Sequence, residues 1–138
     1  MVKNKSIEIS TEPDDIYDIS THVQRFVSDI GAKDGAVIIF AVGSTCAITT
    51  IEFEPGLRRD FPKTLEKIAP KGKYHHDATW GDGNGHSHLR SSLIGTSLTV
   101  PVMSGTIATG TWQQIVFCEF DVKYRKRKII LMYLGDTD

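Results

Sequence analysis

The order of helical and extended patterns along the chain limits the folds open to it. Apolar side chains recur three and four residues apart in the interior of the chain, and segments rich in Val, Ile, Thr and Phe lie before and after these stretches. A doubly wound parallel sheet needs strands and helices in regular alternation instead. We therefore predict an α+β fold, a compact single domain over residues 1–138 whose antiparallel β-sheets form a sandwich-like core with two to three helices.

Two stretches have the spacing of an amphipathic helix. Ser20 or Thr21 can cap the first, and Gly31 is placed to end it. The second covers about 57–68 and precedes Pro70. The residues that form the two apolar faces are Val23, Phe26, Val27 and Ile30 in the first helix, and Leu57, Phe61, Leu65 and Ile68 in the second. Pro62 indicates that the second helix begins at Asp60 or bends.

The extended segments suggest how the sheets are connected. We expect the first two strands, 6–10 and 16–19, to pair with each other. The segments 36–42 and 47–53 are predicted to be central strands because they are rich in β-branched and apolar residues. Short turns join the last four segments, so the chain is expected to end in an antiparallel meander; these segments are 97–102, 106–109, 111–120 and 128–134.

Charge and hydropathy exclude some classes of function. Sixteen basic and seventeen acidic residues give a formal net charge of −1, so the protein has no overall field that attracts nucleic acid or an anionic membrane. The apolar run 36–42 is too short to span a bilayer, and we expect a cytoplasmic protein. Cys46 and Cys118 are expected to be reduced, buried thiols.

A basic run from Lys123 to Lys128 surrounds a predicted hairpin. Such a run can bind phosphate, diphosphate or RNA, although most runs of this kind are solvated turns. Nucleic acid is the least favoured partner because Tyr124 is the only aromatic residue in the run. A small phosphorylated ligand is therefore the partner that the sequence favours.

Four of the five histidines fall within fourteen residues: His75, His76, His86 and His88. We expect residues 71–85 to form a long polar loop leading into a short helix at about 88–94. Imidazoles bind divalent metals such as zinc and also transfer protons near neutral pH, so the cluster favours either chemistry. The alternative is a solvated loop with locally hydrogen-bonded histidines.

The spacing of the histidines and their neighbours limits which of them can act together. His86 and His88 are two residues apart and would diverge on a helix, although a loop could direct both inward. Asp77, Asp82 and Asn84 are interleaved with the histidines, and the Asp82-Gly-Asn-Gly sequence can present backbone amides to an anion or a carbonyl. That tetrapeptide lacks the Lys-Ser/Thr ending of a phosphate-binding loop.

Two further segments carry candidate site residues. Glu52 and Glu54 point to one side near the end of a predicted strand, where they could supply a ligand or a base, or form an exposed edge. Alternation along 111–120 places Gln113 and Glu119 on one face, where they could share a cleft. Trp112 lies on the other face and is expected in the core or at a subunit interface.

Several of these motifs together resemble a known family. The segments Gly43 to Glu52, His76-Asp77, Asp82 to Gly95 and Gly110 to Gln114 are similar, in this order, to the YjbQ-like family, also labelled secondary thiamine-phosphate synthases. The resemblance covers nearly the whole chain and is to the archaeal-type branch. It implies an α+β fold assembled as a homotrimer, with the site near subunit boundaries.

The resemblance also implies roles for individual residues. His76 and His88 match the two shared histidines, and Gly110, Trp112, Gln113 and Glu119 match the late strand motif. Ser44 stands where many bacterial members have histidine, and His86 is the candidate to replace it. The predicted set is thus catalytic His76, His88 and Glu119; substrate-binding Asn84, Arg90, Trp112 and Gln113; and, for a divalent metal such as zinc or magnesium, His76, His86, His88 and Glu52.

The family label implies a reaction that joins a pyrimidine diphosphate to a thiazole phosphate with loss of diphosphate. Arg90, the amides around Gly83 to Gly85 and the basic hairpin would hold the phosphates. Two alternatives stay open: a trimeric protein that binds a metal or a small ligand, and a hydrolase that uses metal-activated water.

Overall fold

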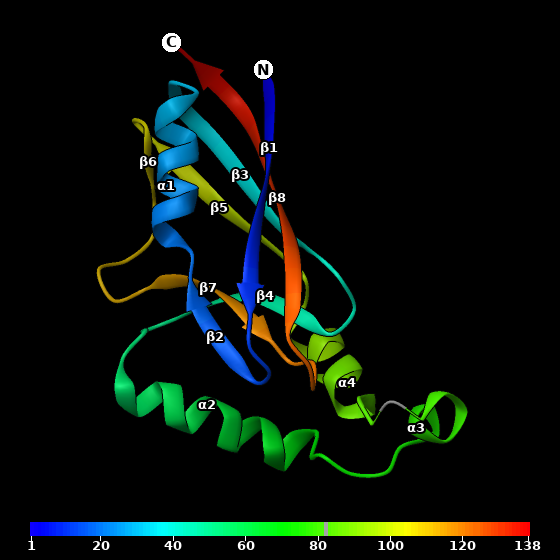
Figure 1. The fold of residues 1–138 in the computed structure, drawn as a ribbon. Coiled ribbons are helices and arrows are strands. Elements are labelled where there is room, and N and C mark those ends of the chain that lie inside the picture. Colours follow the sequence, from blue (N-terminus) through cyan, green and yellow to red (C-terminus); the bar gives the residue numbers. More distant parts are fainter. Residues whose placement is uncertain (82) are drawn as a thin grey trace.

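Strands and helices are assigned in a computed structural model that describes residues 1–81 and 83–138. The strands are β1 (Val2–Thr11), β2 (Asp15–Asp18), β3 (Ala32–Val42), β4 (Cys46–Ile51), β5 (Ser97–Met103), β6 (Thr106–Ile107), β7 (Gln114–Glu119) and β8 (Arg125–Thr137). The helices are α1 (Ser20–Asp29), α2 (Pro55–Ile68), α3 (His75–Trp80) and α4 (Gly85–Ile94) (Figure 1).

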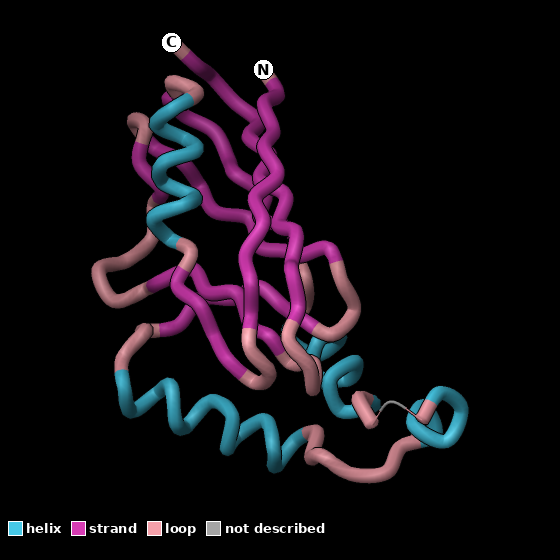
Figure 2. Tube along the Cα trace, viewed as in Figure 1, coloured by secondary structure: helices cyan, strands magenta, loops and turns pink. Residues whose placement is uncertain are grey.

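The strands form two antiparallel sheets. The larger has the order β1-β8-β3-β5-β6 and the smaller has the order β2-β7-β4. Figure 2 shows the long strands of the larger sheet side by side, with α2, α3 and α4 gathered at one end of the molecule. The predicted α+β fold with antiparallel sheets is confirmed. In the described part of the chain, no helix is long and apolar enough to cross a membrane.

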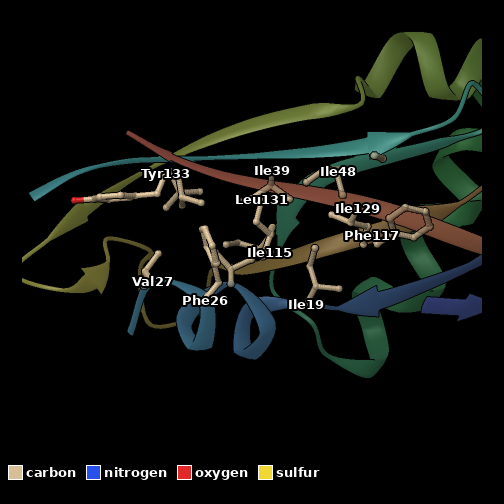
Figure 3. Close-up of a cluster of buried hydrophobic side chains, with 14 of the residues drawn as sticks. Ile19, Phe26, Val27, Ile39, Ile48, Ile115, Phe117, Ile129, Leu131 and Tyr133 are labelled. Carbon is tan, nitrogen blue, oxygen red and sulfur yellow. The ribbon is translucent and has the colours of Figure 1, made fainter. Parts of the chain in front are cut away.

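The main core lies between the two sheets and α1, and Figure 3 shows part of it. It is built from the buried side chains of α1, β3, β5, β7 and β8, among them Phe26, Ile39, Phe117, Leu131 and Tyr133. Complete burial of a large apolar side chain stabilises the fold by about 1.5–3 kcal/mol. These contacts hold the sheets together and give the site a rigid support.

Strand β7 supplies side chains to two cores. Ile115 and Phe117 point into the main core, whereas Val116, Cys118 and Phe120 form a second cluster on the opposite side of the smaller sheet. Leu65 of α2 and Ile94 of α4 contribute to this second cluster. The alternation predicted along this strand is confirmed over these residues.

Helix α1 confirms the first helical prediction, because Val23, Phe26 and Val27 are buried and Gly31 follows with a positive φ. Its cap differs from the prediction. The residue before the helix is Ile19, which makes no side-chain cap, and the Asp18 carboxylate accepts a hydrogen bond from the Ser20 N–H at 2.9 Å. The Ser20 hydroxyl instead accepts a hydrogen bond from the Ile115 N–H at 2.9 Å and ties the helix to β7.

Helix α2 covers Pro55–Ile68, so it includes the predicted range of about 57–68 and begins before Asp60. Glu54 caps it by accepting hydrogen bonds from the backbone N–H groups of Gly56 at 2.9 Å and Leu57 at 2.5 Å. Pro62 lies inside the helix without ending it. The cap and the proline at the first position explain the early start.

The predicted strand connections were partly wrong. β1 pairs with β8 and β2 pairs with β7, so the first two strands do not pair with each other. β7 lies in the smaller sheet and β8 in the larger, so the chain does not end in a meander; β4 is an edge strand and only β3 is central. Local alternation indicates a strand but not its distant partner, which is why these connections were missed.

Two local boundaries also differ from the predictions. Helix α3 forms within the predicted loop 71–85, and α4 begins at Gly85 rather than at about residue 88. β7 begins at Gln114, so residues 111–113 lie before the strand, and β6 has only two residues.

Candidate functional site

The segment from Tyr74 to His88 folds around the side chain of Asp77. The Asp77 carboxylate accepts hydrogen bonds from the N–H of Tyr74 at 3.2 Å and from the N–H of Gly85 at 2.9 Å, and so joins the start of α3 to the start of α4. A Cβ atom at Gly85 would lie 2.7 Å from the Tyr74 Cβ, so only glycine allows this approach.

This arrangement brings two of the predicted histidines together. The ring centroids of His76 and His88 are 4.5 Å apart, with an angle of 49° between the rings, and His76 Nδ1 lies 3.5 Å from Asp77 Oδ1. Burial alone would raise the pKa of Asp77, but the hydrogen bonds from Gly85 and Tyr74 and the neighbouring His76 lower it overall. An ionised carboxylate beside paired imidazoles is suited to hold and pass on a proton.

The other two histidines point elsewhere. His86 is 2% exposed; its Nε2 lies 3.4 Å from the Ser87 hydroxyl, and its Nδ1 has no hydrogen-bond partner among the residues that the structure describes. Burial and the charge of Arg90 lower the pKa of His86. On α4 it faces the Arg90 side, as expected for residues two apart on a helix. His75 is exposed on α3.

Two adjoining pockets share Ser44 and His88. The first, with a volume of about 240 Å³, is here named the charged pocket; its walls are Ser44, Thr45, Asn84, His88, Asp121, Val122, Lys123 and Arg125. The second, with a volume of about 300 Å³, is named the hydroxyl pocket; its walls are Gly43, Ser44, His88, Ser91, Ser92, Gly95 and Thr96. Together they form a groove between the β3–β4 turn, α4 and the β7–β8 turn, which lie near one another in Figure 1.

Asp121 organises the charged pocket. This carboxylate is 1% exposed and accepts hydrogen bonds from Asn84 Nδ2 at 3.3 Å, Thr45 Oγ1 at 3.2 Å and the Val122 N–H at 2.8 Å. Arg125 Nε lies 3.2 Å from it. Burial raises the pKa of Asp121, but these hydrogen bonds and the charge of Arg125 outweigh that effect and lower it. Asp121 therefore fixes Asn84 and Arg125 in the pocket wall.

Glu119 lies beneath this pocket and is fully buried. Its carboxylate accepts two hydrogen bonds from Arg127, at 2.6 Å and 2.5 Å, one from Thr11 at 2.6 Å and one from the Asp121 N–H at 3.0 Å. The structure thus places the predicted catalytic Glu119 in a saturated ion pair under the groove. Arg127 also supports the β3–β4 turn, since a Cβ at Gly43 would lie 2.7 Å from Arg127 Nη1.

The predicted substrate-binding residues divide between the groove and other places. Asn84 lines the charged pocket. Arg90 is buried outside the groove walls; its Nε donates to the Ala69 carbonyl at 2.9 Å and its Nη2 donates to Glu66 at 2.7 Å, which attaches the end of α2 to α4.

Trp112 and Gln113 lie before β7 on the surface. Trp112 is 72% exposed, so it is not a core residue. Gln113 accepts a hydrogen bond from the Gly110 N–H at 3.0 Å and donates one to the Thr50 hydroxyl at 3.2 Å. Strand β7 begins at Gln114, directly after Gln113, and Glu119 is buried against Arg127. Gln113 and Glu119 therefore do not share a cleft.

The predicted metal ligands do not converge. Glu52 is exposed just after β4, and His86 faces away from the pair formed by His76 and His88. Among the residues that the structure describes, no three His, Cys, Asp or Glu side chains are grouped as a metal site. Asp82, interleaved with the histidines in the sequence, lies outside the described residues.

A third cavity lies between α2 and the smaller sheet and has a volume of about 30 Å³. Phe61, Leu65, Arg90 and Phe120 are among its lining residues. This space holds about two water molecules and is too small for an organic ligand.

Sequence reasoning missed most of the groove walls. Thr45, Asp121, Ser92 and Thr96 were not singled out, and Ser44 was noted only for the histidine that it replaces. The signal that could have found them is their position, since they flank strand and helix ends at one edge of the molecule. Lys123 and Arg125 belong to the basic run that was identified.

The fold and the groove together define an α+β protein with a histidine pair beside a cationic pocket. The family model of the UPF0047 protein YjbQ-like family matches residues 5–136. The chain belongs to this family. A UPF0047 protein from Archaeoglobus fulgidus is 41% identical over 117 residues, covering 84% of this chain and 89% of that protein. YugU from Bacillus subtilis is 33% identical, covering 88% of this chain and 90% of the relative.

Solved structures share the fold. A YbjQ-like protein of unknown function from Sulfolobus solfataricus P2 aligns with a TM-score of 0.88 and 29% identity over 99% of this chain and 100% of that chain. An uncharacterised YjbQ/UPF0047 protein from Clostridium acetobutylicum aligns with a TM-score of 0.82 and 34% identity over 93% and 99% of the two chains. The resemblance to the YjbQ-like family, archaeal relatives included, is confirmed.

Proposed function

We propose that the groove binds a small phosphorylated ligand and that His76 and His88 move a proton during its reaction. One observation carries the proposal: His88, paired with His76 and Asp77 behind it, lines a pocket whose wall also contains Lys123 and Arg125. Cationic side chains bind phosphate oxygens through charge-assisted hydrogen bonds. The imidazole of His88 lies at the boundary between this pocket and the hydroxyl pocket, where a bond between phosphate and the rest of the ligand would lie.

The specific reaction proposed is of the secondary thiamine-phosphate synthase type. A nitrogen of the thiazole phosphate would bond to the methylene carbon of the pyrimidine diphosphate, while the carbon–oxygen bond breaks and diphosphate leaves. Lys123 and Arg125 would stabilise the charge on the leaving group, and His88 would donate a proton to it. With their phosphate groups in the charged pocket and their uncharged rings along the groove, the two substrates would react without the entropic cost of a free encounter.

A divalent metal stays a prediction that the side chains support only in part. His76 and His88 could provide two nitrogen ligands, but among the described residues no three His, Cys, Asp or Glu side chains are grouped so that they could hold a metal ion. The donor set therefore does not fit a zinc site built by one chain. The steps above accordingly use only the charged and titratable side chains.

Incubation of the purified protein with both substrates tests the reaction, with thiamine phosphate detected by mass spectrometry. We expect product formation, a loss of roughly 10²–10⁴-fold in rate for His88→Asn, and the wild-type rate for His22→Asn on the exposed surface of α1. Absence of thiamine phosphate under all conditions would refute the synthase reaction. Titration with inorganic diphosphate separately tests ligand binding, which Lys123→Ala with Arg125→Ala should abolish.

The same titrations separate the alternatives. A protein that only binds a small ligand would bind diphosphate and form no product from any substrate pair. A metal-dependent hydrolase would release phosphate from a phosphate ester only after metal is added and would lose that activity with EDTA.

We also propose that the chain forms the homotrimer expected from the family resemblance. The outer face of the larger sheet supports this, because β3 and β8 expose Phe40, Val42 and Leu134 there by about two-fifths each. Half-buried apolar side chains of the same strands continue this face, namely Ile38, Ile130 and Met132. Apolar patches of this kind commonly mark protein interfaces.

Light scattering during size-exclusion chromatography tests the assembly. We expect a trimer for the wild type and for Thr21→Lys on α1, and a monomer for Phe40→Lys. A monomeric wild type, or a trimer that persists in Phe40→Lys, would contradict the proposal. Since the face ends at Val42, directly before Gly43 and Ser44, a partner bound there would lie next to the groove.

A further inference from the structure

We propose that Ser44 determines which phosphorylated ligands the groove accepts, by keeping its two pockets connected. This inference rests on the proposed function and names a substrate class: phosphate esters whose remaining part is uncharged and carries hydrogen-bonding groups. Ser44 and His88 are the two residues common to both pockets.

The two pockets differ in chemistry. The charged pocket contains Lys123 and Arg125, which suit a phosphate group. Among the described residues, the hydroxyl pocket is lined by neither a lysine or arginine nor a carboxylate; apart from His88, its polar side chains there are hydroxyls, those of Ser44, Ser91, Ser92 and Thr96. A hydroxyl donates and accepts hydrogen bonds, so this pocket suits a neutral polar group rather than a second anion.

The walls of the hydroxyl pocket are fixed by contacts with the sheets. The Ser91 hydroxyl donates to the Cys46 carbonyl at 2.6 Å. The Ile48 N–H donates to the Gly95 carbonyl at 3.1 Å, and the Ala41 N–H donates to the Thr96 carbonyl at 2.8 Å. The pocket is therefore part of the folded framework and has a volume of about 300 Å³, at the small end of the range for ligand pockets.

Ser44 stands between these pockets on the β3–β4 turn and is exposed. Its side chain has a single oxygen beyond Cβ, so it leaves the groove continuous past His88. A large side chain at this position would fill the boundary and separate the pockets. Because the turn is at the surface, a larger side chain there has room to be accommodated without a change in the core.

Two probes distinguish the pockets in calorimetric titrations of the full-length protein. Inorganic phosphate needs only the charged pocket, whereas uridine 5′-monophosphate joins a phosphate to an uncharged, hydrogen-bonding body. For the wild type we expect the nucleotide to bind on the order of tenfold or more tightly than phosphate, the gain of one or two added hydrogen bonds. For Ser44→Phe we expect the nucleotide to lose this advantage; because Ser44 also borders the charged pocket, phosphate affinity should fall as well, but much less, since Lys123 and Arg125 stay in place.

Two further variants serve as controls. Ser44→Ala keeps the passage open and should bind the nucleotide within about threefold of the wild type, the loss of one exposed hydrogen bond. Ser92→Phe, on the exposed surface of α4, should reduce nucleotide binding selectively by filling the hydroxyl pocket from the opposite wall. Circular dichroism and thermal unfolding would verify that both phenylalanine variants fold.

The outcomes separate this inference from the function on which it rests. If the wild type binds neither probe, both the proposed function and this inference fail. If it binds both, but Ser44→Phe weakens them equally or weakens neither, the role of Ser44 is wrong and phosphate binding in the groove still stands. Selective loss of the nucleotide in Ser44→Phe supports the role of Ser44.

Discussion

Replacement of Arg127 by methionine tests how the support beneath the groove is held together. The substitution removes two of the four hydrogen bonds that Glu119 accepts, those at 2.6 Å and 2.5 Å, and leaves Thr11 and the Asp121 N–H as its partners. Glu119 is fully buried and Arg127 is 4% exposed, so water does not replace the guanidinium. Removal of one partner of a buried ion pair costs about 3–5 kcal/mol.

Two more hydrogen bonds of Arg127 argue for the upper part of that range. Arg127 Nη2 donates to the Thr45 hydroxyl at 2.7 Å and to the Thr45 carbonyl at 3.3 Å, so the β3–β4 turn loses support as well. The remaining donor to Glu119 from Thr11 is itself in β1, which pairs with the strand that carries Arg127. For a chain of this size, we expect a fall of roughly 10–15 °C in the unfolding midpoint.

Urea unfolding followed by fluorescence measures the loss. The double variant Arg127→Met with Glu119→Leu removes both charges, and it should recover most of the stability because two apolar side chains of similar volume replace the pair. Two results would refute the reasoning that each buried charge is stable only because the other pairs with it. One is a fall of less than about 1 kcal/mol in the free energy of unfolding of Arg127→Met, and the other is a double variant less stable than Arg127→Met.

Three more outcomes follow from local contacts. The folded structure lowers the pKa of Asp121, so its carboxylate stabilises the protein at pH values above the unfolded pKa of about 3.9. This stabilisation is lost as the pH falls through the folded pKa. In Asp121→Asn, the free energy of unfolding should therefore fall less steeply with decreasing pH in the acid range. Gly85→Ala should cost roughly 1–3 kcal/mol in thermal unfolding, and Tyr74→Ala should relieve only a small part of this cost, because it removes the Cγ and Cδ2 atoms 3.0 Å from the added Cβ but keeps the Tyr74 Cβ at 2.7 Å. Cys46 and Cys118 are buried and free, and burial raises the pKa of Cys118 to about 12, so a thiol reagent should label neither before unfolding; rapid native labelling would contradict their burial.

Local patterns predicted individual elements better than their connections. The face of α1 and the alternation along β7 could be predicted because each depends on side chains a few residues apart. The pairing of β1 with β8 depends on residues more than 100 positions apart, so no local period reports it. Helix α3 was missed because its stabilising contact is the Asp77 carboxylate between two helix starts.

Some residues of the candidate site could be predicted from the sequence, and others could not. The rings of His76 and His88, which the sequence assigned to one site, lie 4.5 Å apart between their centroids. The divergence of His86 follows from its spacing once that segment is helical, and this was one of the two outcomes considered. Asp121 was missed because its position after a strand becomes informative only when the neighbouring strand and helix ends that hold Asn84 and Thr45 are also known.

The two sides of the groove, the charged pocket and the histidine pair, are attached to the rest of the fold in different ways. Glu119, Arg127 and Asp121 connect the charged pocket to the sheets through hydrogen bonds between buried groups, so that pocket keeps its shape with or without a ligand. His76 instead stands on α3, a helix of six residues whose start is attached to α4 through the carboxylate of Asp77. A ligand would therefore meet a fixed phosphate pocket on one side and, on the other, a proton-transfer group whose position depends on one carboxylate. Asp77→Asn should thus reduce the rate of a reaction in the groove far more than the affinity for phosphate, and an equal effect on both would show that Asp77 also shapes the charged pocket.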